Sequence, residues 1–232
     1  MNAQTWLRPG RRPYHSMRAL GLMVVSIALA GCGFNLGGGP QVQGSGVVKT
    51  EKREVPGFSA IEVSGAVKLE FTVADETKVE VTTDDNLLPL FITEVDGETL
   101  KIYMKGSTST NKGMVANVTG PSPKAITGSG AITAEAKGLK GKALKVHLSG
   151  ASNATLSGTV DDLQLECSGA SQVHATGLDV QVAKVDASGA STAEVKATKE
   201  LDARASGAST IRYEGSPALK VSATGASSVT KK

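Results

Sequence analysis

The amino-acid sequence predicts an all-β protein built as a parallel β-solenoid, and three observations carry that prediction. A Ser-Gly-Ala turn sequence recurs at intervals of 18 to 20 residues through the second half of the chain. On both sides of each turn, apolar and polar residues alternate with period two, as they do when one face of a β-strand is buried. After residue 31, no segment has the apolar spacing of an amphipathic helix.

The repeated turn is the most regular of these features. Its glycine recurs after 20, 19, 20, 18 and 18 residues, and five copies extend to Ser/Thr-Gly-Ala-Ser. Glycine suits a tight turn because it adopts positive φ without a steric penalty. We expect the flanking serines to stack in ladders, with hydroxyls that hydrogen-bond from coil to coil. The predicted structural turn glycines are Gly65, Gly130, Gly150, Gly169, Gly189, Gly207 and Gly225.

The strands are predicted by aligning the repeats on this glycine. In the repeat of Gly169, inward residues Leu163, Leu165 and Cys167 alternate with Gln164 and Glu166. A unit of this size cannot bury its own apolar face, so neighbouring repeats must stack to form a continuous core. A β-sandwich with evenly spaced turns is the alternative, but it does not explain why the turn sequence itself repeats.

We assign residues 47–232 to a single solenoid domain, less regular over residues 47–120 and regular over residues 121–232. In the less regular part, two alternating segments flank Asp96-Gly97, a favoured hairpin turn. These strands are expected to form the opening coils and to cap one end of the stack.

The first 46 residues have a different character. Residues 1–31 combine a basic segment with a short apolar run that ends in Leu-Ala-Gly before Cys32, the pattern of a lipoprotein signal peptide. We predict that Cys32 is lipidated and that residues 32–46, which are rich in glycine, form a flexible tether. Either Met1 or Met17 could be the true start. Gly33, rather than aspartate, follows the cysteine. This favours sorting of the lipoprotein to the outer membrane of the bacterial cell envelope.

Removal of the signal changes the charge of the chain. Four of the 25 basic residues lie before Cys32 and no acidic residue does, which leaves 21 basic against 22 acidic residues. A nearly neutral chain lacks the basic footprint of a nucleic-acid-binding protein. With Cys32 lipidated, Cys167 has no cysteine partner.

The order of several short motifs resembles that of a known family. These are Gly-Phe-Ser-Ala-Ile-Glu-Val-Ser-Gly at residues 57–65, Asp-Asn-Leu-Leu-Pro at 85–89, Asp-Gly-Glu-Thr-Leu at 96–100, and the repeated Ser-Gly-Ala-Ser turns. Together they resemble the auto-transporter adhesin family with the head GIN domain, over roughly residues 47–232. The resemblance implies a right-handed parallel β-helix in an exported, often lipid-anchored protein without established catalytic residues.

Candidate catalytic and metal-binding residues are few. His147 and His174 lie on different strands without ligands at metal-binding spacing, and Cys167 occupies an inward position. The acidic pairs at residues 84–85 and 161–162 could join a calcium or polysaccharide-cleaving site, but turn acids in solvent are the expectation because no calcium-binding nonapeptide is present. We predict no catalytic residue, metal site or cofactor.

Three functional hypotheses remain. The first is a membrane-anchored, non-catalytic module for adhesion to a glycan or protein ligand, since solenoids present long regular faces. The second is a structural envelope protein that self-associates as a homo-oligomer through an open coil. The third is a carbohydrate-active enzyme that uses Asp or Glu on a solenoid face, to be tested at Asp161 and Asp162.

Overall fold

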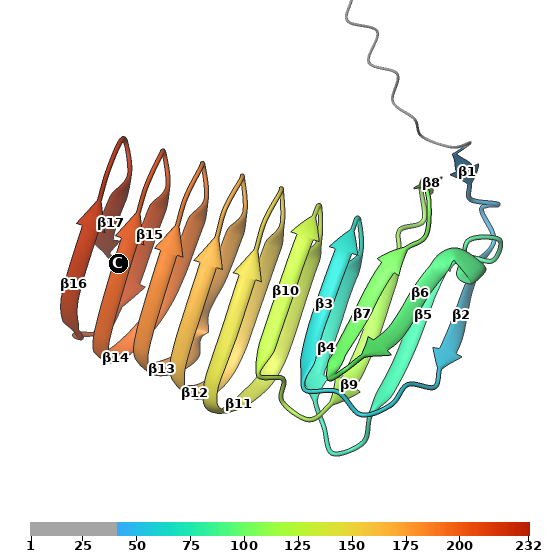
Figure 1. Ribbon diagram of the computed structural model, residues 1–232, viewed down its shortest axis with the longest axis horizontal. Coiled ribbons are helices and arrows are strands. Elements are labelled where there is room, and N and C mark those ends of the chain that lie inside the picture. Colours follow the sequence, from blue (N-terminus) through green and yellow to red (C-terminus); the bar gives the residue numbers. More distant parts are fainter. Residues whose placement is uncertain (1–40) are drawn as a thin grey trace, which may run out of the picture. The chain divides into compact units, whose positions relative to one another are not determined.

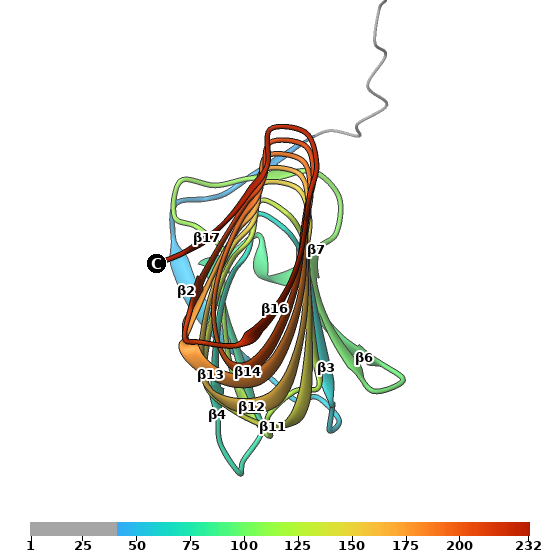
Figure 2. The ribbon, with the colours of Figure 1, turned by 90° about the vertical axis from the view of Figure 1, so that its left-hand side faces the viewer.

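The computed structural model describes residues 41–232, in which β-strands stack as parallel coils along one axis (Figure 1). The predicted β-solenoid is confirmed, with about five turns. The only helical element of this part of the chain is the 3-10 turn η1, Leu88–Leu90. Viewed along the stack, the coils are flattened and superimpose closely (Figure 2).

Four long strands form the regular part of the stack. Each passes around a loose corner, so its first half follows one Ser-Gly-Ala turn and its second half precedes the next. The halves that precede turns form one wall, here called the pre-turn sheet, and those that follow turns form the post-turn sheet. The strands of this region are β10 (Ala125–Gly130), β11 (Thr133–Leu148), β12 (Asn153–Cys167), β13 (Gln172–Ala187), β14 (Thr192–Ala205), β15 (Thr210–Glu214), β16 (Ala218–Ala223) and β17 (Ser228–Lys231).

The turn glycines lie directly above one another. All seven have φ between 73° and 92°, a region that side chains of L-residues rarely adopt. In addition, a Cβ on Gly169 would lie 2.5 Å from the carbonyl oxygen of Gly150 in the preceding coil. Gly65 begins the column, and a Cβ there would meet nothing within 4 Å. The stack therefore needs glycine both for the turn and for the approach of successive coils.

The second serine of each turn points into the core. Ser171 Oγ donates to the carbonyl oxygen of Ser168 at 2.6 Å, and Ser191 Oγ donates to that of Ser188 at 2.8 Å. Longer bonds reach the preceding coil, as from Ser191 Oγ to the Cys167 carbonyl oxygen at 3.3 Å. The expected coil-to-coil bonding is therefore present. For Ser171 and Ser191 the shorter bond lies within the turn, whereas Ser209 Oγ donates to the Ala187 carbonyl oxygen of the preceding coil at 3.0 Å.

The N-terminal end of the stack is closed by antiparallel strands. β6 pairs with β7 through the predicted hairpin, where Gly97 has a φ of 62°, and β5 pairs with both β2 and β9. These strands surround the aromatic part of the core, with Phe71 and Phe91 fully buried. The strands of this region are β1 (Val42–Gln43), β2 (Val48–Arg53), β3 (Ala60–Gly65), β4 (Lys68–Val73), β5 (Lys78–Asp84), β6 (Phe91–Asp96), β7 (Thr99–Met104), β8 (Thr108–Ser109) and β9 (Val115–Gly120).

Residues 42–46, which the sequence places in the tether, are hydrogen-bonded to the domain. β1 pairs with β8, and the Gly46 amide donates to Asp84 Oδ1 at 2.6 Å. Asp84 is 1% exposed and also accepts from the Thr110 hydroxyl, so the expectation of a solvated turn acid is wrong for this residue. Its carboxylate is buried because it joins the start of the domain to the loop after β8.

The far end of the stack is open. Within residues 41–232, β16 forms a ladder with β14 alone, and all six of its residues are exposed. Leu219 and Val221, which continue the inward columns of the preceding coils, are 48% and 50% exposed. This coil presents both an apolar surface and a free strand edge.

The predicted signal peptide, the two possible start residues, the lipidation site at Cys32 and the tether up to residue 40 lie outside the described residues. Over residues 41–232, no helix is long and apolar enough to cross a membrane.

Candidate ligand-binding trough

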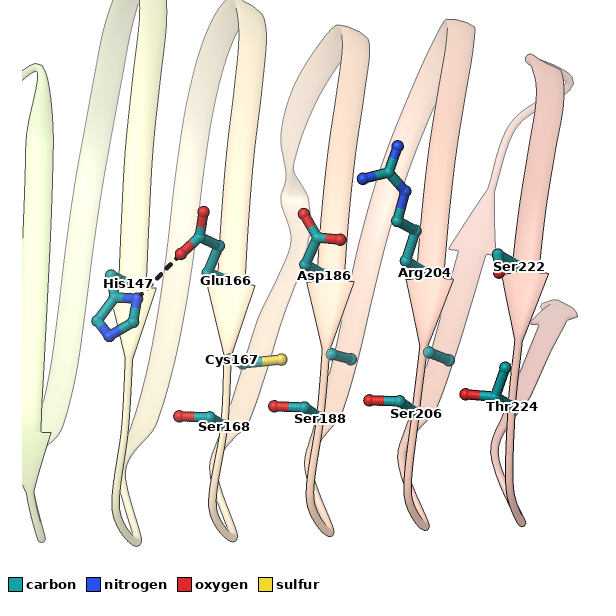
Figure 3. Close-up of a pocket in the computed structure, with 12 residues that line it drawn as sticks. His147, Glu166, Cys167, Ser168, Asp186, Ser188, Arg204, Ser206, Ser222 and Thr224 are labelled. Atoms are coloured by element: carbon teal, nitrogen blue, oxygen red, sulfur yellow. Dashed lines mark hydrogen bonds and ion pairs between the residues drawn. The ribbon is translucent and has the colours of Figure 1, made fainter.

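The outer face of the pre-turn sheet carries two parallel rows of polar side chains. One row stands three residues before each turn glycine and the other stands one residue before it, so both point outward while the residue between them faces the core. Figure 3 shows the two rows running parallel to each other across successive coils. The first row comprises His147, Glu166, Asp186, Arg204 and Ser222, and the second comprises Ser168, Ser188, Ser206 and Thr224.

These rows enclose a cavity of about 420 Å³, here called the serine groove. Between the rows, the cavity is lined by the inward residues Cys167, Ala187 and Ala205. Because neighbouring strands lie roughly 4.8 Å apart, each row repeats at that interval along the stack. The groove is consequently a periodic surface, with one hydroxyl and one larger polar group per coil.

The two kinds of serine in the repeated turn have different roles. The second serine is buried and its hydroxyl is used within the turn, as for Ser171 and Ser191. By contrast, the hydroxyls of Ser168, Ser188 and Ser206 donate to no other residue among positions 41–232. They point in the same direction along the groove (Figure 3). The outward row is therefore free to hydrogen-bond to a ligand.

The row of larger groups contains both charges. His147 Nδ1 lies 3.3 Å from Glu166 Oε2, and Arg204 Nη2 lies 3.1 Å from Asp202 Oδ2. Asp186 lies 3.7 Å from the ammonium group of Lys184. These contacts lie at the surface, so each contributes little to stability. Their groups remain accessible for contacts with hydroxyl, carboxylate or amine groups of a ligand.

The groove continues toward the N-terminal coils through two more cavities. A small one of about 260 Å³ lies between Lys145, His147, Gln164 and Glu166. It shares Lys145 with a larger cavity of about 620 Å³, here called the lysine cleft. We call the three adjoining cavities the trough. The lysine cleft is lined by Ser122, Pro123, Lys124, Ala125, Lys140, Gly141, Lys142, Ala143 and Lys145.

The residues considered as catalytic candidates from the sequence are not brought together. The side chains of His147 and His174 are half-exposed and lie on opposite sheets, where each pairs with a glutamate of the next coil. Asp161 Oδ1 accepts a hydrogen bond from Gln181 Nε2 at 2.6 Å. Among the described residues, no group of three His, Cys, Asp or Glu side chains could hold a metal ion.

Cys167 is a core residue. It is 2% exposed, and its Sγ lies 3.5 Å from the Ser191 hydroxyl. Burial raises the pKa of the Cys167 thiol above its ordinary value. Because the thiolate is the nucleophilic form, this cysteine is held in its unreactive state beneath the floor of the groove.

The coils, their turns and the polar trough define the chain as a β-solenoid with a ligand-accessible sheet. The chain belongs to the family described as putative auto-transporter adhesin, head GIN domain, whose model matches residues 57–217. This confirms the resemblance that the short motifs indicated. Among curated protein sequences, none matches the chain.

Solved structures share the fold. A putative adhesin from Bacteroides fragilis is 20% identical with a TM-score of 0.68, covering 82% of this chain and 100% of that one. A putative adhesin from Parabacteroides distasonis is 24% identical with a TM-score of 0.59, covering 83% and 100%. A putative lipid binding protein from the same species is 22% identical with a TM-score of 0.57, also covering 83% and 100%. These similarities establish the fold alone.

Proposed function

We propose that this protein is a non-catalytic adhesin of the bacterial cell envelope whose pre-turn sheet binds an extended glycan. Family membership favours an adhesion-type role. The observation that supports a glycan as the ligand is the outward row of hydroxyls on Ser168, Ser188 and Ser206. These hydroxyls donate to no partner among the described residues. A polysaccharide also presents one set of hydroxyls per unit, at a spacing comparable with that of successive coils.

The binding mode follows from the groove. The serine hydroxyls can donate to and accept from sugar hydroxyls, while Glu166, Asp186 and Arg204 on the other side supply stronger, charge-assisted hydrogen bonds. Several weak contacts in register along one chain give affinity that a single site would lack.

The test removes the hydroxyl row without touching the core. The triple variant Ser168→Ala, Ser188→Ala, Ser206→Ala is compared with Asn153→Ala, Gln172→Ala, Thr192→Ala, three successive outward positions of the post-turn sheet. On a glycan array, the first variant is expected to lose the binding that the wild type and the second variant retain. Equal binding by both variants would contradict the proposal.

The lipid anchor is a second part of the proposal. A protein with Cys32 carrying a diacylglyceryl group is held stably at a membrane, since two acyl chains suffice for anchoring. The glycine-rich residues after Cys32 would let the solenoid stand away from the lipid surface. Gly33 favours sorting of the lipoprotein to the outer membrane. In cell fractionation, Cys32→Ser is expected to move the protein out of the membrane fraction, and mass spectrometry should detect the lipid on the wild type.

Self-association is a second candidate function, and the open coil favours it. Leu219 and Val221 are about half exposed beside the free edge of β16, an arrangement that invites strand pairing. A second copy of the chain could pair its own β16 in antiparallel fashion and cover both apolar residues. Analytical ultracentrifugation should then show a dimer that Val221→Lys abolishes, and a strict monomer at high concentration would exclude it.

A further inference from the structure

Four lysine residues line the lysine cleft at one corner of the solenoid. Lys124 precedes β10, and Lys140, Lys142 and Lys145 lie on β11 where that strand rounds the loose corner. The chain bends there because Gly138 and Gly141 have φ values of 71° and 147°.

The main chain holds these lysines together. The Lys145 amide donates to the Lys124 carbonyl oxygen at 2.9 Å, and the Lys140 amide donates to Ser122 Oγ at 2.9 Å. Pro123 is buried between them and Ala125 and Ala143 line the cleft. Charged groups therefore surround an apolar floor that the backbone keeps in place.

These four lysines differ from most others in the chain because they have no counter-charge. Within the described residues, no carboxylate oxygen lies within 4.0 Å of any of their ammonium groups, whereas Lys78, Lys137 and Lys196 each pair with an acid at 2.7 to 2.8 Å. In the next coil, Asp161 is bound to Gln181 instead. Four like charges around one cavity repel one another, and an anionic ligand would relieve that repulsion.

The cleft is continuous with the serine groove. The small cavity at Lys145 joins it to His147 and Glu166, the first members of the polar row. A linear molecule can therefore run from the four lysines diagonally across the pre-turn sheet to Thr224.

We propose that the lysine cleft binds the anionic groups of an acidic polysaccharide, the carboxylates of uronic acids or ester sulfates, while the serine groove holds the sugar chain. The inference rests on the proposed glycan binding and adds the charge of the ligand. Each ammonium group forms an exposed ion pair with an acidic substituent, and the pairs weaken as salt is added.

The experiment measures binding of the purified protein to two polyanions, polygalacturonate and dextran sulfate. Their uncharged counterparts, methyl-esterified polygalacturonate and dextran, are measured alongside them. The cleft variant carries Lys124→Gln, Lys140→Gln, Lys142→Gln and Lys145→Gln. The matched control carries Lys52→Gln, Lys105→Gln, Lys112→Gln and Lys199→Gln, four exposed lysines that form no ion pair among the described residues and give the same net charge.

We expect wild type and control to bind at least one polyanion, with affinity that falls as salt rises, and the uncharged counterparts to bind much more weakly. The cleft variant should bind about tenfold more weakly than the control, as four exposed ion pairs imply. Equal affinity of cleft variant and control would overturn the inference. So would binding of no polyanion by the wild type.

Two further outcomes separate the alternatives. Binding to charged and uncharged polysaccharides alike, lost only in the serine-row variant, would contradict the lysine cleft and leave the proposed glycan binding intact. Cleft-dependent binding to phosphatidylglycerol vesicles, with none to either polyanion, would replace the polysaccharide by a membrane surface. If the cleft variant loses binding to a polyanion and the wild type does not bind the vesicles, the inference is supported directly.

Discussion

Gly128 and Ile132 lie on either side of the turn at Gly130, and the end of the Ile132 side chain occupies the space that a Cβ on Gly128 would fill. In the next coils, Leu148 and Cys167 take the place of Gly128, and the buried serines Ser152 and Ser171 take that of Ile132. In the coil of Gly130, the large side chain follows the turn and no side chain precedes it. In the next coils, the larger side chain precedes the turn and a serine follows it. The volume of side chains in the core is therefore kept by exchanging the two positions.

The exchange predicts coupling between the two positions. Gly128→Val should lower the free energy of unfolding by about 1 to 3 kcal/mol because it overpacks the core against Ile132. Ile132→Ser alone should cost about 2 to 5 kcal/mol through the cavity it leaves. The double variant should lose at least about 1 kcal/mol less than the sum in urea unfolding. Strict additivity would show that the two side chains do not share this space.

The turn glycines allow the cost of conformation to be separated from that of stacking. Gly65 and Gly169 both have positive φ, but only a Cβ on Gly169 would meet the preceding coil. Gly65→Ala should cost about 1 to 2 kcal/mol, the penalty of a left-handed residue. Gly169→Ala should cost more, because the Gly150 carbonyl must also move. Equal losses in thermal unfolding would mean that the column tolerates a methyl group.

The two serines of one turn should respond differently to the same substitution. Ser191→Ala removes a buried hydroxyl bonded to the Ser188 carbonyl oxygen, and should cost about 1 to 2 kcal/mol of unfolding free energy. Ser188→Ala alters only the outward row, and its effect should stay within about 0.5 kcal/mol. Chemical denaturation of both variants checks this. A reversal of the order would mean that the outward row has a structural role.

Glu194 predicts a dependence of stability on pH. Desolvation raises its pKa, but the hydrogen bond from His174 and the charge of Lys232 outweigh this, so the pKa lies below its ordinary 4.5. Arg212 Nη1 lies 3.4 Å from the same carboxylate. Because the folded-state pKa is lowered, the stabilisation is present above about pH 4.5 and is lost as pH falls through the folded-state value.

The variant Glu194→Gln should therefore be less stable than wild type near neutral pH, by roughly 0.5 to 1 kcal/mol. The difference should vanish in strong acid. Glu54→Gln removes the same charge at a site without an ion pair among the described residues, and its unfolding curve should follow the wild type at every pH. A difference between Glu194→Gln and wild type that persists unchanged into acid would contradict the assignment.

The period-two pattern predicted much of the fold because it depends only on which face of a strand is buried. Leu165 and Val185 face the core as expected, and the Asp96-Gly97 hairpin is confirmed. Ser171 also faces the core, in phase with Val173 two residues later, but its polar side chain does not mark it as a core residue. The burial of Asp84 depends on a contact with Gly46, far away in sequence.

The trough was harder to predict than the fold. From the sequence, His147 is notable only for lacking ligands at metal-binding spacing, although alignment on the turn glycines places it in one row with Glu166, Asp186 and Arg204. The lysine cleft depends on the pairing of residue 125 with Lys145, which brings Lys124 beside β11. A sequence signal was nevertheless present, since residues 124–145 contain five lysines and a single acidic residue.

The location of the ligand is the central element of the proposed function. Backbone amide chemical shifts, followed during a titration with oligogalacturonate, test that location directly. Glycan binding along the trough predicts changes at Lys124, Lys145, His147, Ser188 and Ser206, with the outward positions of the post-turn sheet, such as Gln172 and Thr210, unchanged. Changes confined to the post-turn sheet, or no changes at saturating ligand, would contradict it.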